Sequence, residues 1–194
     1  MNNYLELLLY RNQFQLATVD ALYSDGDRYR PATAALDHLK GKLSATGNVL
    51  VLGAGLGSMV RAMRKYGYDP RFTLVDIDKV VLKWAMECLD DERISSIVPV
   101  CDSAQRFIAE TQKKYDLIFI DVFSGRVVPA FVTSAAFLEQ CRECLAPGGF
   151  VAFNYIINDQ KEWEEVQRTC SLVLPGYKVI DLGANRIIIA KASS

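Results

Sequence analysis

VLVLGAGLGS, residues 49–58, joins four consecutive apolar residues to three glycines at alternate positions. An unbroken apolar run is typical of a strand that is buried on both faces, as in a parallel sheet. Gly53, Gly55 and Gly57 permit a tight strand-to-helix turn and let a ligand approach bare backbone at the start of a helix. The stretch therefore predicts a buried strand, a helix over residues 57–66 and a binding site between them, although such a turn can also be only a tight crossover.

Strands and helices alternate along the rest of the chain. Further strands are predicted at 72–76, 96–100, 115–121, 150–156, 178–182 and 186–190, the last two joined as a hairpin. Helices are predicted after Asp78, at 103–112, from Thr133 to before Pro147, and at 159–173. This order predicts an α/β fold with a doubly wound, mostly parallel seven-stranded sheet of the Rossmann type and an antiparallel last strand. A generic α/β sheet with another connectivity is the alternative.

The segment before this sheet is predicted to be small. Residues 13–30 indicate a short β-hairpin, and Pro31 fits the first turn of a helix that runs to about Leu43. We therefore divide the chain into an N-terminal hairpin segment, 1–30, and a Rossmann-like domain, 31–194, which together form one structural domain.

Composition and charge limit the number of domains and the kinds of partner that the chain can have. The chain has 194 residues, 51% of them hydrophobic, with 22 basic and 23 acidic side chains and a net charge of −1. It is too short for two ordinary domains, and its charge gives no reason to expect a nucleic-acid or membrane partner. We expect no signal peptide, and five cysteines favour a reducing, cytoplasmic location over a disulfide framework. Cys141-x-x-Cys144 has no second pair or histidine cluster beside it, so no metal site is expected.

Three aspartates follow successive predicted strands, where ligands bind in this topology. Asp76 lies 23 positions after Gly53 and can accept both hydroxyl hydrogens of a ribose. Asp102 could accept from an adenine amino group or cap the following helix. Asp121 stands at the end of a strongly apolar strand, so desolvation is expected to raise its pKa and make it a better proton acceptor. The alternative is that Asp121 only stabilises the loop that follows it. Ser58 stands where a dinucleotide fingerprint prefers glycine, which favours an adenosyl ligand over NAD without excluding NAD.

The motifs VLVLGAGLGSMVRAM, LVDID, CDSAQRFI, YDLIFIDVFSG and LAPGGFVAFN resemble those of class I S-adenosylmethionine-dependent transferases. Within that methyltransferase fold they most resemble the spermidine synthase, or polyamine aminopropyltransferase, family. The resemblance implies that Asp76 binds ribose, that Asp102 lies near adenine, and that Asp121 helps to deprotonate the attacking amine. The family's tyrosine before the first helix corresponds to Tyr29, which the resemblance therefore implies to be catalytic together with Asp121. The aspartate of the family's glycine loop is replaced by Leu56.

The expected activity is transfer of an aminopropyl group to a small-molecule amine, with S-adenosylmethionine or its decarboxylated form as cofactor. A small-molecule methyltransferase, a non-catalytic adenosyl-binding domain and, more distantly, a nicotinamide oxidoreductase remain as alternatives. Leucine at position 56 would neither attract the amine of the decarboxylated cofactor nor repel the carboxylate of the intact one, so weak discrimination between them is expected. The sequence leaves a homodimer open.

Overall fold

The computed structural model describes residues 5–18, 22–90 and 93–192. Its main sheet has seven strands in the order β6-β5-β4-β7-β8-β10-β9. Strands β4 to β8 are parallel, and β10 runs antiparallel to both β8 and β9. The predicted doubly wound sheet with an antiparallel last strand is thereby confirmed. The strands of this sheet are β4 (Asn48–Leu52), β5 (Arg71–Asp76), β6 (Ile97–Cys101), β7 (Tyr115–Ile120), β8 (Leu145–Ile156), β9 (Lys178–Leu182) and β10 (Asn185–Lys191).

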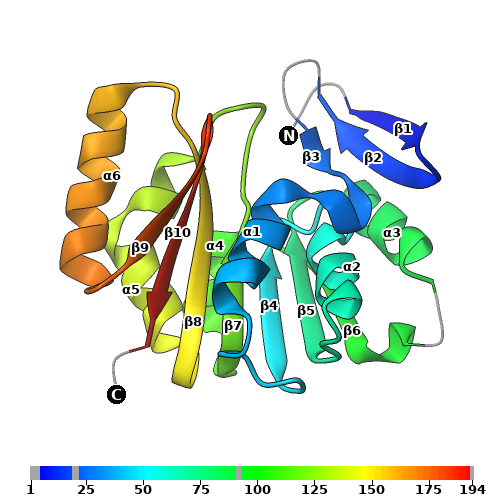
Figure 1. The fold of residues 1–194 in the computed structure, drawn as a ribbon, viewed down its shortest axis with the longest axis horizontal. Helices are drawn as coiled ribbons and strands as arrows, with labels where there is room; N and C mark the ends of the chain where they lie inside the picture. Colours follow the sequence, from blue (N-terminus) through cyan, green and yellow to red (C-terminus); the bar gives the residue numbers. More distant parts are fainter. Residues whose placement is uncertain (1–4, 19–21, 91–92, 193–194) are drawn as a thin grey trace.

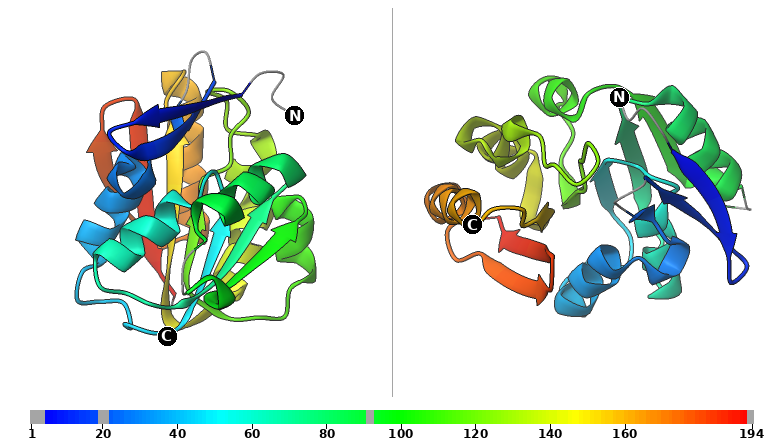
Figure 2. Two further views of the ribbon diagram at one scale, coloured as in Figure 1. Left: turned by 90° about the vertical axis from the view of Figure 1, so that its right-hand side faces the viewer. Right: turned by 90° about the horizontal axis from the view of Figure 1, so that it is seen from above.

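Helices cover both faces of the sheet (Figures 1 and 2). The helices of one face are α1 (Arg30–Leu39), α2 (Ser58–Lys65) and α3 (Lys79–Cys88), and those of the other are α4 (Ala104–Glu110), α5 (Ala135–Glu143) and α6 (Gln160–Val173). The described residues also form three short 3₁₀ helices: η1 (Gly26–Arg28), η2 (Ile94–Ser96) and η3 (Ala130–Thr133). None of the helices in the described part of the chain combines the length and apolar character needed to cross a bilayer.

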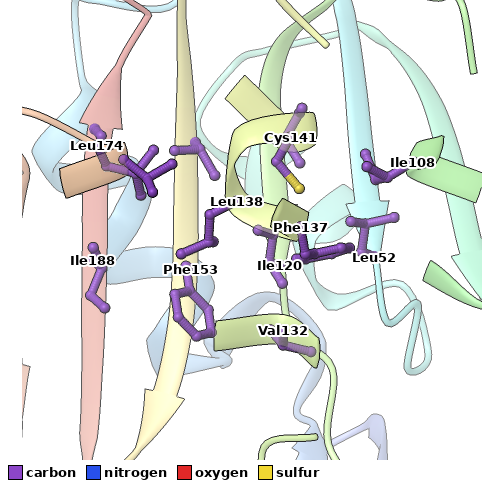
Figure 3. Close-up of a cluster of buried hydrophobic side chains, with 14 of the residues drawn as sticks. Leu52, Ile108, Ile120, Val132, Phe137, Leu138, Cys141, Phe153, Leu174 and Ile188 are labelled. Atoms are coloured by element: carbon purple, nitrogen blue, oxygen red, sulfur yellow. The ribbon is translucent and has the colours of Figure 1, made fainter. Parts of the chain in front are cut away.

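Alternate residues of each central strand enter different cores because successive side chains of a strand point to opposite faces. Leu117 and Phe119 pack in the core under α1 to α3, whereas Ile118 and Ile120 pack in the core under α4 to α6. Figure 3 shows part of the second core, where side chains of α5 lie beside those of the sheet. The same alternation continues past the ends of the strands and decides which face a polar side chain joins.

The N-terminal segment is larger than predicted. It forms a three-stranded antiparallel sheet of β1 (Glu6–Tyr10), β2 (Gln13–Ala17) and β3 (Leu22–Ser24), which Figure 1 shows beside the α1–α3 side of the main sheet. The pairing of β2 with β3 falls within the hairpin expected over 13–30, while residues 19–21 lie outside the described residues. Strand β1 was missed, because its turn is Arg11-Asn12, two non-glycine residues with φ of 49° and 61°.

Three predicted boundaries were wrong. Helix α1 ends at Leu39 rather than near Leu43. Helix α5 begins after Thr133, because the hydroxyl of Ser134 caps it by accepting from Phe137 N. Strand β8 starts at Leu145, so the Pro-Gly-Gly sequence lies inside it, and a register shift opposite Tyr115 absorbs the irregularity.

Candidate active site

A cavity of about 240 Å³ opens where β4, β5 and β7 end, as the topology predicts. Residues from five parts of the chain line it: the N-terminal segment, the glycine turn, the β5–α3 connection, the start of α4 and the loop after β7. The lining residues that belong to the sequence prediction are Gly53, Gly55, Asp76 and Asp121. Its described lining carries the carboxylates of Asp76, Asp78 and Asp121 and no basic side chain, so the cavity favours a cationic ligand.

Neighbouring backbone leaves little or no room for a side chain at two positions of the glycine turn. A Cβ on Gly53, which has a φ of 87°, would lie 2.2 Å from the carbonyl oxygen of Asp121. A Cβ on Gly55 would lie 3.1 Å from the carbonyl oxygen of Tyr23. Gly57 begins α2 in the left-handed conformation and packs against Leu89, and it is not among the residues that line the cavity. Two of the three predicted glycines therefore meet the cavity, and the third shapes the helix start.

Asp76 ends β5 and is held in place by the turn. Its Oδ2 accepts from Ala54 N at 3.0 Å, and its Oδ1 accepts from Asp78 N at 2.9 Å. Burial raises the pKa of Asp76 above its ordinary value, and these backbone donors act in the opposite direction. A carboxylate offers about four lone-pair sites, so each oxygen can still accept one further hydrogen bond. Such an arrangement can bind two adjacent hydroxyl groups.

Asp102 lies beside the cavity but does not line it. Its Oδ1 accepts from Ser103 N at 2.6 Å, and its carboxylate pairs with Arg106, whose Nε lies 2.8 Å from Oδ1. The N-cap of α4 is Ser103, whose hydroxyl accepts from Arg106 N. Ser103 and Ala104 line the cavity in place of Asp102. A contact between Asp102 and an adenine amino group therefore stays a prediction.

Asp121 and Tyr29 are brought together, although 92 positions separate them. The hydroxyl of Tyr29, a residue only 5% exposed at the start of α1, donates to Asp121 Oδ1 at 3.2 Å. Asn154, fully buried in β8, donates from Nδ2 to the same oxygen at 2.7 Å. Neither bond engages Oδ2. Asn154 was not predicted as a site residue; its only signal in the sequence is an amide inside the otherwise apolar run FVAFNYI.

The electrostatics of this cluster suit proton transfer. Burial raises the pKa of Asp121 to about 7, with the hydrogen bonds from Asn154 and Tyr29 acting to lower it. Burial and the neighbouring Asp121 carboxylate raise the pKa of Tyr29 well above its ordinary value, so Tyr29 remains a donor. A carboxylate whose pKa lies near neutrality can accept and release a proton at physiological pH.

The N-terminal sheet forms one wall of the site through β3. Ser24 Oγ accepts from Leu56 N at 3.2 Å and lies 2.6 Å from Ser58 Oγ, while Tyr23 donates to Gly125 O in the loop after β7. The side chain of Leu56 is 2% exposed and packs with Leu16 rather than lining the cavity. Leu56 therefore does not face the cavity, and its effect on discrimination between the two cofactors stays a prediction.

Comparison with known proteins identifies the family. The sequence model of the spermine/spermidine synthase domain matches residues 32–180, which is more than half of the chain. The chain belongs to this family. Polyamine aminopropyltransferase 1 of Pseudomonas aeruginosa is 31% identical over 115 residues, which make up 55% of this chain and 39% of that protein. An N-terminal histidine N-methyltransferase of Emericella nidulans is 31% identical over 119 residues, 59% of this chain and 21% of that protein.

Solved structures confirm the methyltransferase-like fold of this spermine/spermidine synthase domain. A probable spermidine synthase from Corynebacterium glutamicum has a TM-score of 0.79 at 21% identity, covering 100% of this chain and 79% of that one. Human methyltransferase-like protein 13, in complex with SAH, has a TM-score of 0.69 at 20% identity, covering 86% of this chain and 82% of that one. The chain spans about two-fifths of the length of the Pseudomonas aeruginosa aminopropyltransferase.

Proposed function

We propose that this protein is an aminopropyltransferase that binds decarboxylated S-adenosylmethionine and transfers its aminopropyl group to a small-molecule amine. The observation that carries the proposal is Asp121, a carboxylate with a pKa near neutrality, held by Tyr29 and Asn154 in a cavity that Asp76 also lines. Membership of the spermine/spermidine synthase family supports the choice of reaction.

The residues present fit an adenosyl cosubstrate. Asp76 retains acceptor capacity for two ribose hydroxyls, and Gly53 and Gly55 present backbone without side chains. The acidic lining opposes the pyrophosphate of NAD and attracts the positive charge of a sulfonium. The decarboxylated cofactor carries an ammonium and a sulfonium without a carboxylate, so the same lining favours it over intact S-adenosylmethionine.

In the proposed reaction the protein aligns two reactants and removes a proton. When bound, the adenosyl sulfonium supplies a carbon that an amine can attack as its carbon–sulfur bond breaks. A carbon–nitrogen bond forms, sulfur leaves as a neutral thioether, and the nitrogen loses one proton. Asp121 accepts that proton through Oδ2, the oxygen that the bonds from Tyr29 and Asn154 leave available.

A product assay tests this function. Intact and decarboxylated S-adenosylmethionine are each incubated with putrescine and a panel of mono- and diamines, and mass spectrometry identifies the adenosyl product. 5′-Methylthioadenosine together with an aminopropylated amine is expected. S-Adenosylhomocysteine would show methyl transfer instead, a bound ligand without product would indicate a non-catalytic domain, and tight binding of NAD alone would exclude an adenosyl site.

The role of Asp121 as the base is tested by substituting it and, as a control, a second aspartate of the same strand. Asp121→Asn should lower kcat by a factor of about 10²–10⁴ with little change in cofactor affinity. Asp116→Asn is the control, because Asp116 lies on the same strand but at its other end, where Oδ2 accepts from Asn48 N. Equal losses in the two variants would contradict a specific role for Asp121.

A further inference from the structure

Three polar side chains form a line across neighbouring strands at the site. Asn185 of β10 donates from Nδ2 to Asn154 Oδ1 at 2.9 Å, and Asn154 of β8 donates to Asp121 Oδ1 at 2.7 Å. These residues continue the alternation of Ile187, Ala152 and Phe119, which pack in the core under α1 to α3. Asn185 is only partly buried and does not line the cavity, so it can influence Asp121 only through Asn154.

The direction of the Asn154 amide decides what Asp121 meets. A primary amide has an acceptor on one side and two donors on the other. In the observed orientation its nitrogen faces Asp121 and lies 3.4 Å from Tyr29 Oη, while its oxygen faces Asn185. If the amide were reversed, its oxygen would face Asp121, which could then hydrogen-bond to it only as the protonated acid. The two orientations therefore favour different protonation states of Asp121.

We propose that Asn185 is a positioning residue: its amide donor holds Asn154 in the orientation that stabilises the ionised form of Asp121. This inference rests on the proposed function, in which ionised Asp121 accepts the proton of the amine. An asparagine at position 185 can supply the donor that Asn154 Oδ1 needs, whereas an ionised aspartate there could only accept. A carboxylate at that position would draw the Asn154 nitrogen toward itself and away from Asp121.

A substitution at position 185 leaves the other groups near Asp121 in place. Among the described residues, Tyr29 faces Asp121 from the start of α1, Tyr23 of β3 lines the cavity, and Asp76 and Asp78 line it from the β5–α3 connection. None of these belongs to the line from Asn185 to Asn154. A change at position 185 thus alters the amide without removing a residue from the cavity.

Two variants separate amide orientation from added charge. Asn185→Asp replaces the donor by an acceptor and adds a negative charge, while Asn185→Leu removes the donor without adding charge. Carbon-13 NMR of carboxyl-labelled aspartate, with the Asp121 signal assigned from Asp121→Asn, reports the titration of Asp121 whether or not a substrate is known. The Asp121 midpoint should move upward by at least about one pH unit in Asn185→Asp, a tenfold change in proton affinity, and by a smaller upward amount in Asn185→Leu.

The pH dependence of turnover gives the second readout. In both variants the acid limb of kcat should move upward by the same amount as the NMR midpoint, and kcat should recover to within about twofold above it. Asp181→Asn is the control, because Asp181 lies on the same hairpin and pairs with Arg186 without touching the amide line. It should leave the midpoint unchanged.

The outcomes distinguish this inference from the proposed function. If the Asp121 midpoint does not move in variants that fold, the positioning role is overturned. It is also overturned if the midpoint moves in Asn185→Asp but not in Asn185→Leu, because the added charge alone would then explain the shift. A kcat lowered equally at every pH would also overturn it. If the midpoint moves as expected but no amine is turned over by the unsubstituted protein, the positioning role stands and the proposed function fails.

Discussion

Replacing Tyr29 by phenylalanine removes one hydrogen bond from Asp121 and keeps the buried ring. The hydroxyl donates to Asp121 Oδ1 at 3.2 Å, which stabilises the ionised carboxylate. A hydrogen bond to a charged group contributes about 1.5–3 kcal/mol, and about 1.4 kcal/mol corresponds to one pH unit in a titration. Loss of the bond should therefore move the acid limb of the pH–rate profile upward by about 1–2 pH units.

The size of the effect on kcat follows from the pKa of Asp121 in the unsubstituted protein. Because the pKa of Asp121 is about 7, roughly half of the carboxylate is ionised at neutral pH. An upward move of 1–2 pH units leaves about a tenth to a hundredth ionised, so kcat at pH 7 should fall by about 5- to 50-fold. At a pH well above the new limb, kcat should return close to that of the unsubstituted protein.

Steady-state assays from about pH 5 to about pH 10 measure this profile. Tyr115→Phe is the matched control, because Tyr115 is equally buried, belongs to the strand that leads to Asp121, and has a hydroxyl without a hydrogen-bond partner among the described residues. Its profile should be unchanged. An acid limb that stays in place in Tyr29→Phe, or a loss of the same size at every pH, would refute the role assigned to the Tyr29 hydroxyl.

Three further predictions concern stability and binding. The pKa of Asp121 is about 7 in the folded protein and 3.8 ordinarily, so between these values the folded protein holds a proton that the unfolded chain releases. The free energy of unfolding should therefore fall as the pH rises from about 4 to about 7. Calorimetry should show Asp121→Asn to have the higher Tm at pH 8 but a similar Tm near pH 4; a constant difference across this range would contradict the burial of the charge. Asp76→Ala should weaken binding of 5′-methylthioadenosine by about 1–3 kcal/mol in titration calorimetry, and an unchanged Kd would remove Asp76 from the ribose site. Leu56→Asp should lower the free energy of unfolding by about 3 kcal/mol or more, because Leu56 packs against Leu16 and Val81. Leu56→Met, the control, should change it by less than about 1.5 kcal/mol. An unchanged free energy of unfolding in Leu56→Asp would show that position 56 faces solvent or ligand.

Local patterns were sufficient to predict the main sheet. The run VLVL and the apolar centre of YDLIFID indicated strands buried on both faces, and both became central strands between two layers of helices. Asp78 was predicted to begin a helix, and its Oδ1 accepts from Val80 N at 2.8 Å at the start of α3. These features could be predicted because they depend on residues close together in the chain.

The N-terminal segment and strand β8 show where local patterns were insufficient. Glu6–Tyr10 is almost uniformly apolar without alternation, and the Arg11-Asn12 turn lacks the glycine that usually marks such hairpins. Strand β8 passes through Pro147-Gly148-Gly149, a sequence typical of a loop, because its pairing with β7 holds the chain on both sides, at Leu145 and at Phe150. In both cases a neighbouring strand, absent from any local window, decided the conformation.

The candidate site divides in the same way. Asp76 and Asp121 could be predicted as site residues because each directly follows a predicted parallel strand, and the topology alone brings strand ends together. The hydrogen bonds from Tyr29 and Asn154 to Asp121, and from Asn185 to Asn154, could not be predicted. They depend on how α1 and the last hairpin pack against the sheet. Sequence therefore determined that Asp76 and Asp121 reach the cavity, although Asp102, predicted on the same ground, does not line it. Only the tertiary structure decided the hydrogen-bond partners and the pKa of Asp121, because burial and contacts between distant strands set both.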